Sequence, residues 1–167
     1  MQKIAKDFSG EVFYLPDESI TTSQIISPKY WTETSKSRLG KHCIEDAPMS
    51  AEYRRLLFNS QIIVAGENFG CGLACEQAPW ALEGAGIRCV VAPSFGRVFD
   101  NNVFENNMFA NGLLCITLSK DLIDSMFATK PKAIKIDWES GSVDGLKWFE
   151  LSDYQKNLIR NGGIGTK

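Results

Sequence analysis

The residues best suited to chemistry lie in one run, GENFGCGLACEQAPWALEGAG, from Gly66 to Gly86. Within this run, Gly70 and Gly72 can adopt positive φ angles and let a ligand approach the backbone closely. A helix that begins soon after them would add unpaired N–H groups and the positive end of a helix dipole. Such a loop could bind a carboxylate or a phosphate. The spacing alone, however, slightly favours a plain turn between a strand and a helix.

The familiar nucleotide-binding patterns do not fit this loop. A G-x-G sequence is present at Gly70–Gly72, but Cys75 stands where a dinucleotide fingerprint has its third glycine. No lysine follows, so the loop is not a P-loop either. A nucleotide ligand is therefore not indicated.

The cysteines are the other candidates for chemistry. They are odd in number and scattered, which favours free thiols over disulfides: Cys43, Cys71, Cys75, Cys89 and Cys115. Cys75, at the start of the expected helix, could have a lowered pKa and act as a nucleophile or base, or it could simply pack as a small hydrophobe. A Cys–His couple would require His42 to fold beside the loop. We expect no metal site, because there is no CxxC pair and only one histidine.

Composition indicates one soluble α/β domain spanning residues 1–167. The chain has 44% apolar residues and a net charge of −2, so nothing in its charge favours nucleic acid or an anionic membrane as a partner. Its apolar runs are too short to span a bilayer, and the N-terminal residues lack the apolar stretch of a signal peptide. These features predict a cytoplasmic protein.

The apolar runs place the loop inside a βαβ unit. Buried strands are expected at QIIVAG, IRCVVAPSF and LLCITL, with a helix from about Cys75 that has Pro79 in its first turn and ends at Gly84 or Gly86. Further elements are expected as an early strand at GEVFYLP, helices at AEYRRLLF, SKDLIDSMFA and 152–161, short helical turns within 95–112, and a hairpin at KAIKIDW and VDGLKWFEL. Residues 17–48 read as a long irregular segment, functional or mobile.

Several segments together resemble the small subunit of 3-isopropylmalate dehydratase, the swivel domain of the aconitase superfamily. The loop matches that family at Asn68–Gly72, at Glu76 and at 78–82. The resemblance continues through Ser94, Phe95, Phe99, Asn101 and Asn102, and through QIISPKYW, LGKHCIED and LIRNGGI, so that it covers nearly the whole chain.

The resemblance implies an aconitase-type swivel domain, layered β/β/α, with a βαβ core and an edge hairpin. It also implies a large-subunit partner that carries a [4Fe–4S] cluster, with no cofactor in this chain, and a small hydroxy-dicarboxylic acid as substrate. The substrate-facing positions that it assigns are Gly70, Cys71, Gly72, Leu73 and Ala74 in the loop, and Lys29, Tyr30 and Trp31 where the family's substrate-selecting loop begins. Trp31 replaces a leucine, which suggests a bulkier lining or a staple against the core.

This sequence departs from the family at the positions that carry the family's chemistry. The family's Ser-Ser-Arg becomes Leu73, Ala74 and Cys75, so that the base position cannot accept a proton and the arginine clamp is lost. The family's histidine becomes Gln77, and its upstream Asp-Thr-Asp becomes Thr-Thr-Ser at 21–23. Glu76 is retained, and capping or bracing of the helix start is favoured for it over acid–base work. Substitute cations could be Arg97, Lys29 or Arg38.

Three functional interpretations stay open at this stage. The first is the small subunit of a heteromeric hydro-lyase or isomerase whose chemistry has diverged, with Cys75 as a candidate catalytic residue. The second is a non-catalytic paralogue that serves as a structural or regulatory partner of the cluster-bearing subunit. The third and weakest is an ordinary dehydratase subunit whose catalytic residues come from elsewhere.

Overall fold

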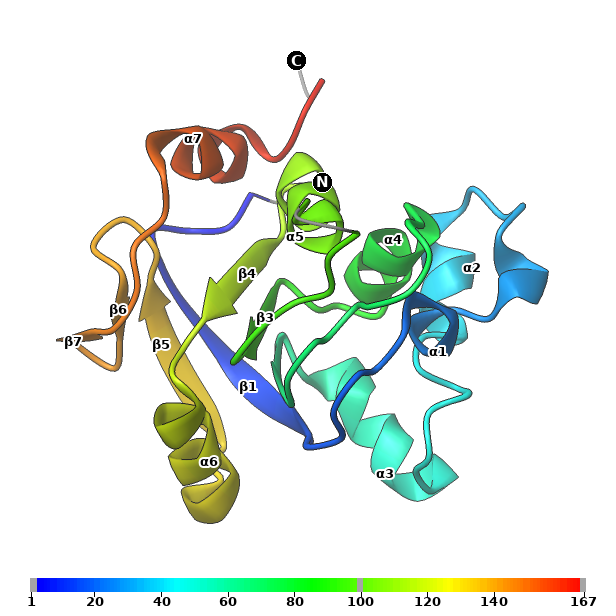
Figure 1. The fold of residues 1–167 in the computed structure, drawn as a ribbon, viewed down its shortest axis with the longest axis horizontal. Helices are drawn as coiled ribbons and strands as arrows, with labels where there is room; N and C mark the ends of the chain where they lie inside the picture. The colour runs from blue at the N-terminus through cyan, green and yellow to red at the C-terminus, as the bar shows by residue number, and fades with distance from the viewer. Residues whose placement is uncertain (1–2, 99–100, 166–167) are drawn as a thin grey trace.

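The computed structural model describes residues 3–98 and 101–165. Within them the strands form one seven-stranded mixed sheet in the order β4-β3-β2-β1-β5-β6-β7 (Figure 1). The long strand β1 (Asp7–Leu15) lies in its middle. On one side, β2 (Ile62–Ala65), β3 (Cys89–Ala92) and β4 (Leu114–Thr117) follow it in parallel. The mixed α/β class and the parallel core predicted from the apolar runs are confirmed.

The parallel strands are the buried half of the sheet. Every residue of β2 and β3 is buried, as is usual for strands covered on both faces. The crossover from β2 to β3 contains α4 (Gln77–Gly84), with Pro79 in its first turn as predicted. After α4 the chain reverses at Gly86, whose φ is +98°. The loop of interest therefore leaves the carboxyl end of a central buried strand.

The other half of the sheet is antiparallel. Here β5 (Ala133–Asp137) pairs with β1 and with β6 (Ser142–Val143), which confirms the predicted hairpin turn, although its second strand is much shorter than the predicted VDGLKWFEL. A further turn at Asp144 and Gly145, both with positive φ, leads into the short edge strand β7 (Leu146–Lys147). This edge lies away from the loop and serves the fold rather than the site (Figure 1).

Four other helices match the sequence pattern. The helix at AEYRRLLF is α3 (Ala51–Arg55), continued by the 3₁₀ helix η2 (Leu56–Asn59). The last two helices, α6 (Lys120–Thr129) and α7 (Asp153–Asn161), have serine N-caps. These are Ser119 for α6 and Ser152, in a capping box, for α7. The Asn-rich run forms α5 (Val103–Ala110). In the described parts of the chain, no helix is long and apolar enough to cross a membrane.

The segment 17–48 is structured, so the prediction of an irregular connection was wrong. It contains α1 (Thr22–Ile25), the 3₁₀ helix η1 (Pro28–Tyr30) and α2 (Lys36–Lys41). Isolated apolar side chains anchor it in the core: Ile25, Ile26, Leu39, Cys43 and Ile44. Helix α2 packs directly on α4. The two backbones are so close that a Cβ at Gly84 would overlap the backbone of Lys36. The segment thereby braces the helix that follows the loop.

Candidate functional site

The loop between β2 and α4 is held between two other segments. On one side, the Gly70 N–H donates to the Ile20 carbonyl over 2.8 Å. On the other, the Asn68 N–H donates to the Ser94 Oγ at 2.8 Å, and the Gly96 N–H donates to the Phe69 carbonyl at 2.8 Å. These bonds fix the path of the backbone independently of the side chains that the loop presents.

Positive φ angles shape the loop at Asn68 (+58°), Gly70 (+77°) and Gly72 (+93°). Gly70 must be a glycine for a second reason, since a Cβ there would overlap the Phe104 ring of α5. The predicted conformational role of Gly70 and Gly72 is confirmed. Gly72 has room for a Cβ, so its positive φ alone calls for glycine there.

Thr22 joins the N-terminal segment to the centre of the loop. Its Oγ1 donates to the Leu73 carbonyl over 2.8 Å, and its N–H donates to the Cys71 carbonyl over 2.9 Å. Thr22 is only 2% exposed. It occupies the middle of the segment where the family has Asp-Thr-Asp, and here it holds the loop in position.

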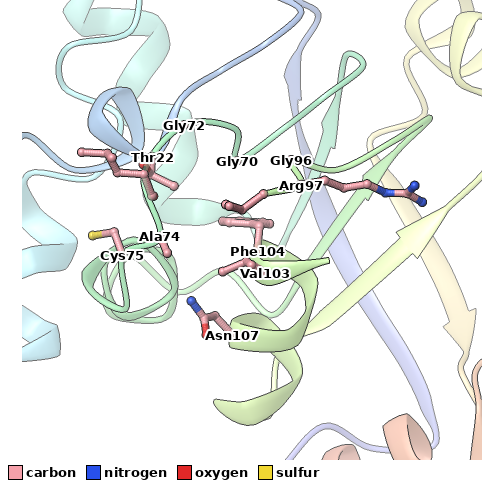
Figure 2. Close-up of a pocket in the computed structure, with 12 residues that line it drawn as sticks. Thr22, Gly70, Gly72, Ala74, Cys75, Gly96, Arg97, Val103, Phe104 and Asn107 are labelled. Atoms are coloured by element: carbon pink, nitrogen blue, oxygen red, sulfur yellow. The ribbon is translucent and has the colours of Figure 1, made fainter. Parts of the chain in front are cut away.

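The loop encloses very little space. The cavity beside it measures about 10 Å³, roughly the room for one water molecule (Figure 2). Its walls come from the loop, from the segment after β3 and from the start of α5: Thr22, Gly70, Gly72, Leu73, Ala74, Cys75, Gly96, Arg97, Val98, Val103, Phe104 and Asn107. A dicarboxylate does not fit inside it. A substrate would therefore have to bind at its mouth, between this chain and another surface.

Five of these wall residues were not found by sequence reasoning: Gly96 and Val98 after β3, and Val103, Phe104 and Asn107 on α5. The sequence predicted only short helical turns in this part of the chain, within 95–112. Phe104 is 4% exposed and lies edge-on to Phe69 with 5.6 Å between the ring centroids. Its contribution could not be read from spacing, because it depends on how α5 packs beneath the loop.

Cys75 does not have the environment of a reactive thiol. It is 7% exposed, and its Sγ donates to the Gln77 Oε1 over 3.4 Å. Burial raises the pKa of the Cys75 thiol, and the N–H groups of Ala78 and Gln77 oppose this only in part. The lowered pKa suggested by its place before a helix is thus contradicted. In Figure 2 its sulfur points away from Phe104 and Arg97. A catalytic role for Cys75 stays a prediction that this geometry disfavours.

The mouth of the cavity is apolar. Leu73 is 64% exposed, and Val98 from the neighbouring segment is 36% exposed. Ala74 is also exposed. At the positions of the family's two serines this chain presents exposed aliphatic side chains, and at the position of its arginine it has the buried Cys75. Phe99, the next residue of the family's pattern, lies outside the described residues.

Lys29, Tyr30 and Trp31 lie apart from this cavity. Lys29 pairs with Glu45 at 3.5 Å, and its Nζ lies 4.9 Å from the Tyr30 ring centroid. Trp31 donates through Nε1 to the Ile26 carbonyl at 3.2 Å and accepts a bond from the Gln77 Nε2 on its own carbonyl at 2.8 Å. Trp31 therefore connects the N-terminal segment to α4, and the staple interpretation fits it better than the lining one.

The single histidine belongs to the same group of residues. His42 stacks on Tyr30 with 4.1 Å between the ring centroids, and its Nδ1 lies 2.9 Å from the Glu45 Oε2. It does not line the loop cavity. A Cys75–His42 couple is not assembled in this structure.

Glu76 occupies the N-cap position of α4, but its side chain makes no capping hydrogen bond. Its carbonyl accepts the Trp80 N–H at 3.3 Å. Glu76 lies at the helix start as expected, but its carboxylate does not cap the helix.

The thiols do not assemble a metal site. Four of the five are buried, and burial also raises the pKa of the partly exposed Cys71. Among residues 3–98 and 101–165, no group of three or more His, Cys, Asp or Glu side chains could hold a metal ion. An iron–sulfur cluster does not fit the residues described here.

The sheet order, the βαβ core and the glycine-shaped loop braced by a helical N-terminal segment define an aconitase-type swivel domain. Residues 23–121 match the family model described as Aconitase C-terminal domain. A crystal structure of 3-isopropylmalate dehydratase from Methanocaldococcus jannaschii has the same fold, with a TM-score of 0.75 at 25% identity, over 96% of this chain and 92% of that one.

Curated relatives narrow the assignment further. The 3-isopropylmalate dehydratase small subunit of Parvibaculum lavamentivorans is 33% identical over 184 residues, which cover 99% of this chain and 89% of that protein. That of Syntrophus aciditrophicus is 35% identical over 163 residues, with 94% and 93% covered. The chain belongs to the aconitase C-terminal domain family, in the branch of the 3-isopropylmalate dehydratase small subunits. The expected fold and family are confirmed.

Proposed function

We propose that this chain is the small subunit of a heteromeric hydro-lyase or isomerase of the aconitase superfamily, acting on a hydroxy-dicarboxylic acid or a related compound with diverged chemistry. One observation carries the proposal: the backbone frame of the loop is intact, while the residues inside it are Leu73, Ala74 and Cys75. Because hydrogen bonds anchor this frame on both sides, the loop keeps its position although its side chains differ from the family's.

The proposed partner is a large subunit that carries a [4Fe–4S] cluster. Relatives named as small subunits support this partner, as does the apolar mouth formed by Leu73 and Val98, which a covering surface would remove from water. The cluster would supply a Lewis acid for the substrate hydroxyl. The cytoplasmic location, and the absence of nucleic-acid and membrane partners, remain part of this proposal.

The contribution of this chain would be to shape and close the substrate space. The loop positions Gly70, Cys71, Gly72, Leu73 and Ala74 would face the substrate through backbone groups and small apolar side chains. Leu73 cannot take a proton, and the raised pKa of Cys75 keeps that thiol protonated near neutral pH. Proton transfer then falls to groups of the large subunit.

The alternative is a non-catalytic paralogue that serves as a structural or regulatory partner of the same large subunit. The missing base favours it specifically, because loss of a general base removes a factor of about 10²–10⁴ in rate. Both interpretations propose the same large subunit as partner, and they differ only in whether the complex converts a substrate.

Co-expression separates the two. The chain is produced with the large subunit encoded in the same genome, the cluster is reconstituted, and 2- and 3-isopropylmalate and related hydroxy-dicarboxylates are assayed. Turnover that requires this chain supports the first proposal. A stable complex without turnover supports the paralogue. If no complex forms, both proposals fail.

A further inference from the structure

A second cavity lies next to the loop and is larger and more polar than the first. It measures about 510 Å³ and lies beyond the carboxyl ends of the parallel strands β2, β3 and β4, a usual place for ligands in open α/β sheets. Its walls are Asn68, Pro93, Ser94, Phe95, Arg97, Glu105 and Thr117. This volume accommodates a small organic acid, unlike the 10 Å³ space under the loop.

Arg97 connects the two cavities, since it lines both. In Figure 2 its guanidinium points away from Thr22 and Cys75. Among the described residues that line either cavity, it is the only one with a positive charge. A guanidinium offers a planar fork of donors that fits a carboxylate in bidentate fashion.

The two other substitute cations are already engaged. Arg38 makes a bidentate ion pair with Glu33, with Nε–Oε2 at 2.6 Å and Nη2–Oε1 at 2.8 Å. Lys29 pairs with Glu45 and lies against Tyr30. Within the described residues Arg97 forms no ion pair, and its charge acts on Glu105 only at a distance. Of the three, Arg97 alone is placed to receive an anion beside the loop.

Hydroxyl groups support the same site. Ser94 accepts the Asn68 N–H on its Oγ at 2.8 Å, which leaves its own hydroxyl proton for another acceptor. Thr117, the last residue of β4, is exposed at the cavity wall. Glu105 is the opposing feature, because its carboxyl contributes a negative charge to the same cavity.

We propose that Arg97, with the Ser94 and Thr117 hydroxyls, forms a binding site for the carboxylate of a small organic acid, displaced from the loop position where the family carries its arginine. The inference rests on the proposed function for the ligand class, but it requires no partner, because every residue of the site belongs to this chain. Arg97 is thus a binding residue, and Glu105 limits the affinity for anions.

The test is a titration of the isolated, ¹⁵N-labelled chain with malate, followed by amide chemical shifts at constant ionic strength. We expect saturable shifts centred on Asn68, Ser94 and Thr117, with a dissociation constant on the order of millimolar for a single exposed ion pair. Arg97→Gln should weaken binding at least about tenfold, whereas the matched control Arg38→Gln should leave it within about twofold.

Glu105→Gln should change malate affinity in the opposite direction to Arg97→Gln. Removing a negative charge from the cavity should strengthen malate binding a few-fold. Shifts that persist in Arg97→Gln, that cluster elsewhere, or that chloride reproduces at the same ionic strength would overturn the site. So would equal losses in Arg97→Gln and Arg38→Gln. Because no partner is present, these outcomes leave the heteromer proposal untouched, and failure of the heteromer leaves this site standing.

Discussion

The Oγ1 of Thr22 donates a hydrogen bond to the carbonyl of Leu73 over 2.8 Å, across 51 positions of sequence. This bond links the helical N-terminal segment to the centre of the loop. Thr22 is 2% exposed and the bond is partly buried, so water replaces it only in part if it is lost.

Thr22→Val should therefore destabilise the protein by about 1–2 kcal/mol, because the partly buried Leu73 carbonyl loses its donor. Urea unfolding measures it. Thr129→Val is the matched control, because the Thr129 hydroxyl also donates to a backbone carbonyl, that of Ser125, but is exposed. Its cost should stay within about 0.5 kcal/mol. Equal losses of unfolding free energy in the two variants would show that the hydrogen bond from Thr22 to the loop contributes no more than an exposed one.

Gly70→Ala should be strongly destabilising, by at least about 2 kcal/mol, because a positive φ and an overlap with Phe104 act together. Gly145→Ala, also at positive φ but with open space around it, isolates the backbone strain and should cost only about 1 kcal/mol. Thermal unfolding of both variants checks this. A Gly70→Ala protein as stable as Gly145→Ala would contradict the packing of α5 under the loop.

Cys75 should react slowly with iodoacetamide at neutral pH, since its raised pKa leaves little thiolate and its exposure is low. Cys71, which is partly exposed, is the control within the same sample and should be labelled about tenfold faster. Site-resolved mass spectrometry reads both. Labelling of Cys75 should rise only at a pH above that at which an ordinary thiol ionises. Fast labelling at neutral pH would restore Cys75 as a reactive group.

The ion pair between Glu33 and Arg38 predicts a stability that depends on acid pH. Bonds from Arg38, and then from the Ser35 and Thr34 N–H groups, lower the pKa of Glu33 to about 2 from an ordinary value of 4.5. A depressed pKa stabilises the fold fully above pH 4.5, and the gain disappears as the pH falls through about 2. Glu33→Gln should lower the melting temperature near pH 7 and not near pH 2. A difference unchanged with pH would contradict this.

The parallel core could be predicted from the sequence because its strands are continuous apolar runs separated by glycine turns. The N-terminal segment could not, because its helices are four to six residues long and its buried side chains, such as Ile25 and Leu39, follow no period. Capping by Thr21 and Ser35 and close packing at Gly84 hold it instead. Those contacts depend on tertiary structure.

The site shows the same division. Glycine spacing correctly indicated where the chain needs positive φ. For Cys75 the packing interpretation fits the structure and the lowered pKa does not, because the effect of burial on its pKa exceeds that of the nearby helix N–H groups. The position of Arg97 between two cavities depends on how the segment after β3 folds beside the loop.

We propose that the loop face, with Leu73 at the mouth of the cavity, is the contact surface for a cluster-bearing large subunit. Size-exclusion chromatography of the co-expressed pair, followed by the visible absorbance of the cluster, tests it most directly. We predict that the chain co-elutes with the cluster protein and that Leu73→Asp, at a position 64% exposed and so neutral for folding, releases it. A wild-type chain that elutes alone, or a Leu73→Asp chain that stays fully bound, would contradict the claim.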